Sequence, residues 1–338
     1  MAKATLPFPK QQQVAIIGGD SLLAREIREL LEAEKPAPRV QLISAAAEDA
    51  TVLTADDEEA VVMLPLSAAS LEGTTVAYLA GSPASSRRTL KLSPNAGGRL
   101  LIDLTGSLAE QPKARLRAPS AEPKATKPTD SAVQVIAHPG AIALTMLLTR
   151  LTAAAKITAS VVHVFEPASE RGRRGIEELR KQTVSVLAFK KLDITVFDTQ
   201  LAFNLLARYG DEALEPLEGI EQRIHQDTAA LLSAWTAIPM PSIRLVQAPV
   251  FHGHSMSIWV EFETNVDTKQ LSRILTAAGI DVRPDEPPSN ANIAGQSGLS
   301  VGAIQADRNN PRACWIWMVA DNLRLSAENA IAVAKERV

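Results

Sequence analysis

The sequence has little cysteine: Cys314 is the only one among 338 residues. A single thiol excludes an internal disulfide and any zinc cluster built from cysteines. Such scarcity is typical of a reducing compartment. Long apolar runs are also absent, since none approaches the roughly 20 residues that span a bilayer, and no apolar segment precedes a cleavage site near the N-terminus. We therefore expect a cytoplasmic protein with no membrane partner.

An excess of one charge is lacking too. Lysine and arginine total 35 against 38 acidic residues, which gives a formal net charge of −3. Such a chain has no long-range attraction for nucleic acid, so we expect no nucleic-acid partner. The 46% apolar and 22% charged residues are those of an ordinary globular protein. The length exceeds that of a usual single domain, which makes two domains the default expectation.

The first half of the chain alternates apolar runs with a helical pattern. Residues 12–19 form an apolar run that ends in two glycines, and apolar side chains recur at helical spacing from Leu22 to Leu31. Strand, glycine turn, helix and strand predict the start of a doubly wound parallel sheet. Three further runs are expected to extend that sheet: residues 60–66, 75–81 and 99–106. Residues 109–130, rich in Pro, Ala, Lys and Ser, predict a surface loop or linker.

The second half has a different character. A strand over 132–137 leads through a His-Pro-Gly turn into a helix over 141–155. The segments that follow are long, rich in Val, Ile, Phe and Trp, and partly alternating, which predicts strands of a large mixed or antiparallel sheet. They cover residues 157–169, 242–264 and 312–322. Amphipathic helices are expected over 219–235, 267–279 and 322–338.

Several strings, taken together, resemble the aspartate-semialdehyde dehydrogenase family. They lie at residues 170–179, 201–207, 248–255, 299–307 and 319–330. The resemblance implies an α/β fold with a Rossmann-like doubly wound domain at 1–137 plus 322–338 and an α+β dimerisation domain at 138–321. It also implies a homodimer and a family activity in amino-acid biosynthesis, the NADP-dependent oxidation of an aldehyde through a cysteine thioester that phosphate cleaves.

The family's nucleophile is missing from this chain. Its Asn-Pro-Asn-Cys-Ser turn falls on residues 138–142, which places Ala141 at the position of the cysteine. A methyl group cannot add to an aldehyde, so the covalent route is closed. Cys314 lies in an alternating apolar strand, and we expect it to be a core residue rather than a displaced nucleophile.

The other catalytic positions of the family differ in how far they are kept. His254 matches the acid/base histidine. Gln247 stands where the family has the arginine that grips the substrate carboxylate, and an amide cannot supply a bidentate charged pair. Glu166 replaces a glutamine and adds a negative charge where an anionic substrate would lie. Glu221 and Arg223 fall on a Glu and a Lys position of a helix.

The nucleotide turn of the family is altered as well. Its three glycine positions fall on Gly18, Ser21 and Ala24, with Gly19 beside the first. Alanine suits the third position, which needs only close packing, whereas serine hinders the approach of a pyrophosphate. Asp20 could cap the helix and compete with a phosphate for the same amides. No cofactor is assigned, and binding of NAD or NADP stays open.

Two other groups of side chains have the composition of binding sites. His252 and His254 are two residues apart on a predicted strand, but no third ligand is near in sequence, so we expect no metal. The basic run 171–174 opens a predicted helix. It fits either an anion site or a solvated charged face.

The changes fall together on the site, whereas the strings that build the core are kept. In this respect the chain is similar to the Usg-type paralogues of the family, which keep a Pro-Val-Phe-x-Gly-His string and lack the cysteine. One interpretation is a non-enzymatic dimer that acts through interaction or ligand sensing. Its dimer partner would be a second copy of the chain or a catalytic relative. The other is an NAD(P)-dependent oxidoreductase with altered chemistry, in which His254 and Ser169 act without a covalent intermediate.

Overall fold

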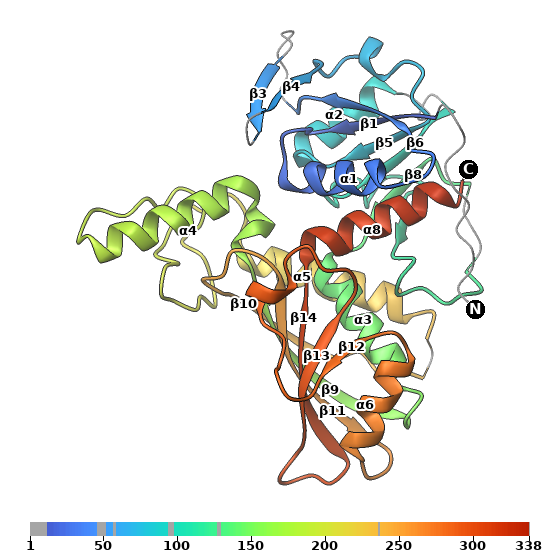
Figure 1. The fold of residues 1–338 in the computed structure, drawn as a ribbon, viewed down its shortest axis with the longest axis vertical. Helices are drawn as coiled ribbons and strands as arrows, with labels where there is room; N and C mark the ends of the chain where they lie inside the picture. Colours follow the sequence, from blue (N-terminus) through green and yellow to red (C-terminus); the bar gives the residue numbers. More distant parts are fainter. Residues whose placement is uncertain are drawn as a thin grey trace. The chain divides into compact units, whose positions relative to one another are not determined.

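The structure is a computed structural model, and it describes residues 12–45, 52–56, 59–93, 98–126, 130–235 and 237–337. The chain divides into two compact units, residues 1–137 with 326–338 and residues 138–325. Each unit is built around its own six-stranded sheet (Figure 1). Among the helices of the described ranges, none is both long enough and apolar enough to cross a bilayer.

The first unit contains a parallel sheet in the order β2-β1-β5-β6-β8-β7. Helices α1 and α2 follow β1 and β5, so the expected doubly wound architecture is confirmed. The central strands are buried along almost their whole length, as parallel strands covered on both faces are. The elements are β1 (Gln13–Ile17), α1 (Leu22–Glu32), β2 (Arg39–Ile43), β5 (Val76–Leu79), α2 (Pro83–Leu92), β6 (Leu100–Asp103), β7 (Arg115–Arg117), β8 (Val133–Ile136) and the short η1 (Ala69–Leu71).

One apolar run does not join this sheet. The prediction that residues 60–66 extend it is wrong, because β4 (Glu59–Met63) pairs antiparallel with β3 (Val52–Asp56) in a separate two-stranded sheet. A single parallel bridge between Ile43 and Leu64 links the run to β2. Two strands only two residues apart in sequence pair with each other more readily than with distant strands.

The expected linker at 109–130 contains an edge strand, β7, which corrects the prediction of a loop. Its Arg117 is only 3% exposed. The guanidinium donates to both carboxylate oxygens of Glu122 at 2.9 Å, to Gln134 at 2.9 Å and to Glu336 at 2.8 Å. Burial of an arginine is tolerated only with such partners, and they come from other segments, so the local sequence did not reveal the strand.

The second unit contains a mixed sheet in the order β10-β9-β11-β14-β13-β12, which confirms the expected mixed architecture. Helix α5 packs on β10, α6 packs on β12 and β13, and α3 packs on both helices (Figure 1). The strands are β9 (Ile157–Glu166), β10 (Ser242–Gln247), β11 (His254–Phe262), β12 (Asp281–Arg283), β13 (Ser300–Ala306) and β14 (Ala313–Ala320). The helices are α3 (Pro139–Leu151), η3 (Ala168–Arg171), α4 (Gly172–Leu187), α5 (Leu217–Leu232), α6 (Thr268–Ala277), α7 (Asn290–Ile293) and α8 (Asn322–Lys335), whose C-terminal part belongs to the first unit.

Alternation along the strands leaves one row of this sheet incompletely covered. Val161, Trp259 and Trp315 are register partners on three neighbouring strands. Val161 is 37% and Trp315 39% exposed, whereas the residues next to them in sequence, such as Val162 and Ile316, are buried. The sheet therefore has one buried apolar face and one partly open face, on which these three side chains form an apolar row.

Candidate functional site

The glycine turn of the first unit keeps a tight backbone. Gly18 has φ +83°, and a Cβ there would lie 2.3 Å from the Cα of Gly81, so only glycine fits. Gly19 packs close to the side chain of Leu42. Ser21 is the N-cap of α1, and its Oγ accepts from the Ala24 amide at 3.0 Å. The capping role that we expected of Asp20 therefore belongs to Ser21, and an amide that a phosphate would use already has a partner.

The second strand-to-helix junction joins β8 to α3. His138 is the N-cap of α3: its backbone N–H donates to Asp227 at 2.7 Å, and its Nδ1 accepts from the Gly140 amide at 3.1 Å. Ala141, the position that the family resemblance gives to the nucleophile, is fully buried in the first turn of the helix. The junction has the expected shape, and it presents an imidazole and a methyl group.

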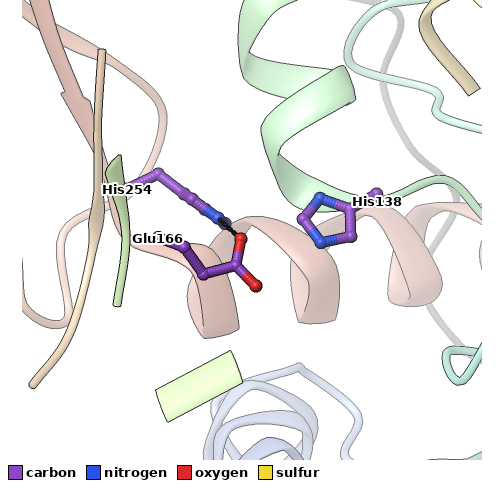
Figure 2. A group of neighbouring side chains, drawn as sticks. All are labelled: His138, Glu166 and His254. Carbon is purple, nitrogen blue, oxygen red and sulfur yellow. Dashed lines mark hydrogen bonds and ion pairs between the residues drawn. The ribbon is translucent and has the colours of Figure 1, made fainter. Parts of the chain in front are cut away.

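Two neighbouring strands place an ion pair close to this junction. Glu166 ends β9 and His254 begins β11, and His254 Nε2 lies 3.2 Å from Glu166 Oε2, with both side chains at most 1% exposed. The other carboxylate oxygen of Glu166 lies 3.3 Å from an Nη atom of Arg171. Arg171 also pairs with Glu215. In Figure 2 the Glu166 carboxylate lies between the rings of His254 and His138.

A second carboxylate completes the buried group. Glu170 Oε2 lies 3.7 Å from Nε2 of His138, while its Oε1 accepts from Asn322 Nδ2 at 2.7 Å. The amide oxygen of Asn322 accepts from Gly253 N at 3.0 Å and from the Ser169 hydroxyl at 3.2 Å. One asparagine at the start of α8 thus ties η3 to the turn before β11.

The pKa values of the two histidines in this group are shifted in opposite directions. Burial lowers the pKa of His254, but its bond to Glu166 and the charge of Glu170 outweigh burial and leave the pKa raised. Burial and the charge of Arg223 hold the pKa of His138 well below its usual 6.5. Burial also raises the pKa of Glu170, against the opposing effect of the His254 charge. His254 therefore takes up a proton at a higher pH than His138 does.

The side-chain amide of Gln247 is hydrogen-bonded to other groups of the protein. Its Nε2 donates to the carbonyls of Glu166 at 2.8 Å and Ala248 at 3.1 Å, and its Oε1 accepts from the Tyr209 hydroxyl at 2.5 Å. The amide is fully buried. Both amide hydrogens are used, so Gln247 offers no donor to an anionic ligand in this arrangement.

Glu221 and Arg223 lie on α5 and take part in structural contacts. Glu221 accepts from the Leu245 amide at 2.6 Å. Arg223 forms an ion pair with Asp227 at 3.6 Å, and Asp227 in turn holds the backbone of His138. Arg223 thus acts on the junction through Asp227 and through its charge.

Two predictions about side chains near the site need correction. Arg171 is not part of a solvated charged face, because its side chain is 15% exposed and paired with carboxylates, whereas Arg173 and Arg174 are exposed as that reading requires. His252 and His254 do not share a strand: β11 begins at His254, and Gly253 turns the chain between them with φ +80°.

Cys314 is a core residue, as we expected. It is fully buried on β14, and burial raises the pKa of its thiol to about 12. The residues that sequence analysis passed over are Glu170, Tyr209, Asp227 and Asn322. Glu170 and Asn322 lie inside strings that carried the family resemblance, but nothing local marked them as partners of His138 or His254.

Three members of the buried group have the composition of a metal site. His138, Glu166 and His254 each have a potential ligand atom within 4.8 Å of the others. No third ligand lies near His254 in sequence, which led us to expect no metal. In space, β9 and the β8–α3 junction bring Glu166 and His138 to it.

The comparisons with known proteins agree with one another over nearly the whole chain. Residues 148–325 match the family model "Semialdehyde dehydrogenase, dimerisation domain". A USG-1 protein homologue of Pseudomonas aeruginosa is 35% identical over 49% of this chain and 50% of its own length, and one of Azotobacter vinelandii is 30% identical over 71% and 72%. An aspartate-semialdehyde dehydrogenase of Rickettsia bellii is 25% identical over 97% and 98%. The solved structure of a probable aspartate-semialdehyde dehydrogenase from Pseudomonas aeruginosa superposes with TM-score 0.82 at 27% identity, over 96% of this chain and 98% of that one.

Proposed function

The chain belongs to the aspartate-semialdehyde dehydrogenase family, and from that premise we propose that it is a dimeric, non-catalytic member that acts through interaction or ligand sensing. The observation that carries the proposal is Ala141. The family resemblance gives it the position of the nucleophile, and in the structure it lies fully buried in the first turn of α3. Aldehyde oxidation through a thioester needs a thiolate at this position, and a methyl group cannot replace it.

The surrounding side chains support the same proposal. Gln247 stands where the family grips the substrate carboxylate, and its amide hydrogens are bound to the carbonyls of Glu166 and Ala248. The carboxylate of Glu166 adds a negative charge that would repel an anionic substrate. Restoring the chemistry would therefore require several changes, because attraction for the substrate is lost together with the nucleophile.

An activity assay tests this proposal directly. Purified protein is incubated with aspartate semialdehyde, NADP and phosphate, and NADPH formation is followed by absorbance beside a catalytic member of the family as positive control. We expect no phosphate-dependent NADPH formation above the buffer blank. Turnover that disappears in a His254→Ala variant would overturn the proposal and favour the oxidoreductase with altered chemistry.

The partly open face of the mixed sheet supports dimerisation. Val161, Trp259 and Trp315 form a continuous apolar row across β9, β11 and β14. These strands lie within residues 148–325, the segment that matches a dimerisation domain. Partly exposed aromatic and aliphatic side chains in one row are typical of an interface. We assign this face to contact with a second copy of the chain.

A matched pair of valine variants tests the dimer. Val161→Glu places a charge in the apolar row, and Val62→Glu places one at a 57% exposed valine of the first unit. Native mass spectrometry should find wild-type and Val62→Glu dimers and Val161→Glu monomers. A monomeric wild-type chain that dimerises only when mixed with a catalytic relative would replace the homodimer with a heterodimer.

A further inference from the structure

The pair formed by Glu166 and His254 already has the spacing of two ligands on one ion. Nitrogen and oxygen ligands lie about 2.0–2.2 Å from zinc, so two of them in a tetrahedral shell are about 3.4 Å apart. His254 Nε2 and Glu166 Oε2 are 3.2 Å apart. A ligand atom of His138 lies within 4.8 Å of both, so a modest movement of one ring closes the set.

Two ring nitrogens of this group have no hydrogen-bond partner. They are Nε2 of His138 and Nδ1 of His254, and the two residues are 2% and 1% exposed. The great majority of buried polar side-chain atoms do have a partner, so a buried imidazole nitrogen without one needs an explanation. A bound ion explains the nitrogen of His138, because Nε2 would become its ligand once the ring has turned. Nδ1 of His254 is not a ligand in this arrangement and carries the proton of that ring while Nε2 binds the ion.

We propose that His138, Glu166 and His254 bind one divalent transition-metal ion of the zinc, iron or cobalt class. Two imidazole nitrogens and one carboxylate oxygen suit these ions, whereas magnesium and calcium prefer oxygen ligands throughout. On binding, the ion takes the place of the proton between His254 and Glu166. Three protein ligands leave a coordination position open for water or a small ligand.

The neighbouring side chains fit this assignment. Arg171 contacts Oε1 of Glu166 and leaves Oε2 for the ion. Glu170, fixed by Asn322, adds a second negative charge close to His138. The two carboxylates offset the partial positive charge at the N-terminus of α3, which would otherwise oppose a cation. Groups that orient the ligands in this way are a regular part of metal sites.

His138 must turn to complete the set. Its Nδ1 accepts from the Gly140 amide, so the proton of the neutral ring is on Nε2. A half-turn about the Cβ–Cγ bond exchanges Nε2 with Cε1 and Nδ1 with Cδ2, which releases Gly140 and leaves Nδ1 free to carry the proton. Nε2 then offers its lone pair. The open position of the metal would give a ligand-sensing protein something to sense, but the site does not depend on that role.

Direct titration tests the site without any enzymatic readout. Tag-free protein is stripped with a chelator and titrated with Zn²⁺ by calorimetry, and with Co²⁺ by visible absorption, which reports imidazole and carboxylate ligation. We expect one ion per chain. Glu166→Gln and His138→Asn, which keep the side-chain size, should each weaken Zn²⁺ binding about tenfold or more, as changes around metal sites commonly do. His254→Ala should abolish it.

Histidines of the same unit outside the group provide the control. His163→Ala on β9 and His225→Ala on α5 should bind Zn²⁺ as the wild type does, and Zn²⁺ should raise the melting temperature of both. Failure of the wild type to bind Zn²⁺ stoichiometrically would overturn the site, as would equal losses in the His163 and Glu166 variants. Metal binding without dehydrogenase activity supports both proposals, whereas a metal-dependent reaction would overturn only the non-catalytic one.

Discussion

The two strand-to-helix turns of the chain differ in where their capping side chains find partners. At the first turn the amides of Gly18 and Gly19 donate to the Ile43 carbonyl of the neighbouring strand, and the capping side chain is local: Ser21 caps α1 through the Ala24 amide, three residues away. The turn at His138 draws on distant segments. Its backbone is held by Asp227, 89 residues along the chain, and its ring lies beside Glu170 and His254.

This difference separates a turn capped within its own segment from a turn assembled by distant segments. In the first turn, Ser21 supplies the side-chain cap of α1. In the second, Glu166, Arg171 and Asn322 form a connected buried network in which each carboxylate has a specific partner. These partners come from segments far apart in the sequence, so the second site depends on the tertiary arrangement of the unit.

The largest effect is expected at the first turn. Gly18→Ala forces a side chain into φ +83° and onto the Gly81 backbone, which should destabilise the first unit by about 3–5 kcal/mol. Gly19→Ala has no left-handed φ to strain and meets side chains rather than backbone, with Leu42 Cβ at 2.9 Å and Met63 Sδ at 3.2 Å, so it should cost less, about 1–3 kcal/mol. All tryptophans lie in the second unit. An unfolding transition that appears in far-UV circular dichroism but not in tryptophan fluorescence therefore belongs to the first unit. Equal costs would contradict the close approach to Gly81.

A pair of asparagine variants compares the two units. Asn322→Ala removes the partners of Gly253 N, the Ser169 hydroxyl and Glu170, and should cost about 2–4 kcal/mol. Asn329→Ala in the first unit removes the acceptor of the Ser120 amide and hydroxyl and should cost about 1–2 kcal/mol. Denaturant titration gives both values. If Asn329→Ala cost more, the second site would not be the more tightly coupled one.

The pH dependence of stability should have two limbs in the second unit. His254 has a raised pKa, so its contribution is present below pH 6.5 and is lost as the pH rises through that raised value. His138 has a lowered pKa, so the stability of its neutral form is present above pH 6.5 and is lost as the pH falls through the lowered value.

Substitution of either histidine should flatten one limb. His254→Gln should remove the alkaline decline relative to the wild type, and His138→Asn should remove the acid decline. The measurement is tryptophan-monitored melting across the pH range in a chelating buffer. Loss of both limbs in one variant would show that the two rings titrate as one coupled group rather than as two groups with oppositely shifted pKa values.

A smaller effect is expected from the cap of α1. Ser21→Gly should cost a few tenths of a kcal/mol and free the Ala24 amide for a phosphate. NADH fluorescence should show no saturation of the wild type below about 1 mM and tighter binding to the variant. Ser82→Gly, at the N-cap of α2, is the control and should bind as the wild type does. Sub-millimolar binding by the wild type would favour the oxidoreductase.

No gain is expected from restoring the thiol alone. Ala141→Cys should leave phosphate-dependent NADPH formation at the blank, because Gln247 remains bound to carbonyls and Glu166 still repels an anionic substrate. Thiol titration confirms that the second cysteine is present. Recovery of activity in this single variant would show that Gln247 and Glu166 matter less than their contacts suggest.

The elements with a strong local pattern were predicted from the sequence. Helix α1 and strands β1, β5 and β6 have clear sequence patterns. The doubly wound parallel sheet of the first unit and the mixed sheet of the second are both confirmed. The exceptions have physical causes. The run at 60–66 pairs with its nearest neighbour, and β7 is too short to show alternation and is fixed by Arg117.

The sequence by itself determined the alanine at position 141, the scarcity of thiols and the glycine turn, because each depends on the identity of one residue or on neighbours a few positions away. Only the tertiary structure decided that His138, Glu166 and His254 meet. They come from the β8–α3 junction, the end of β9 and the start of β11. Pairing of β9 with β11 sets their spacing. Residues that strand pairing brings together form no local pattern in the sequence, so the sequence alone could not reveal this group.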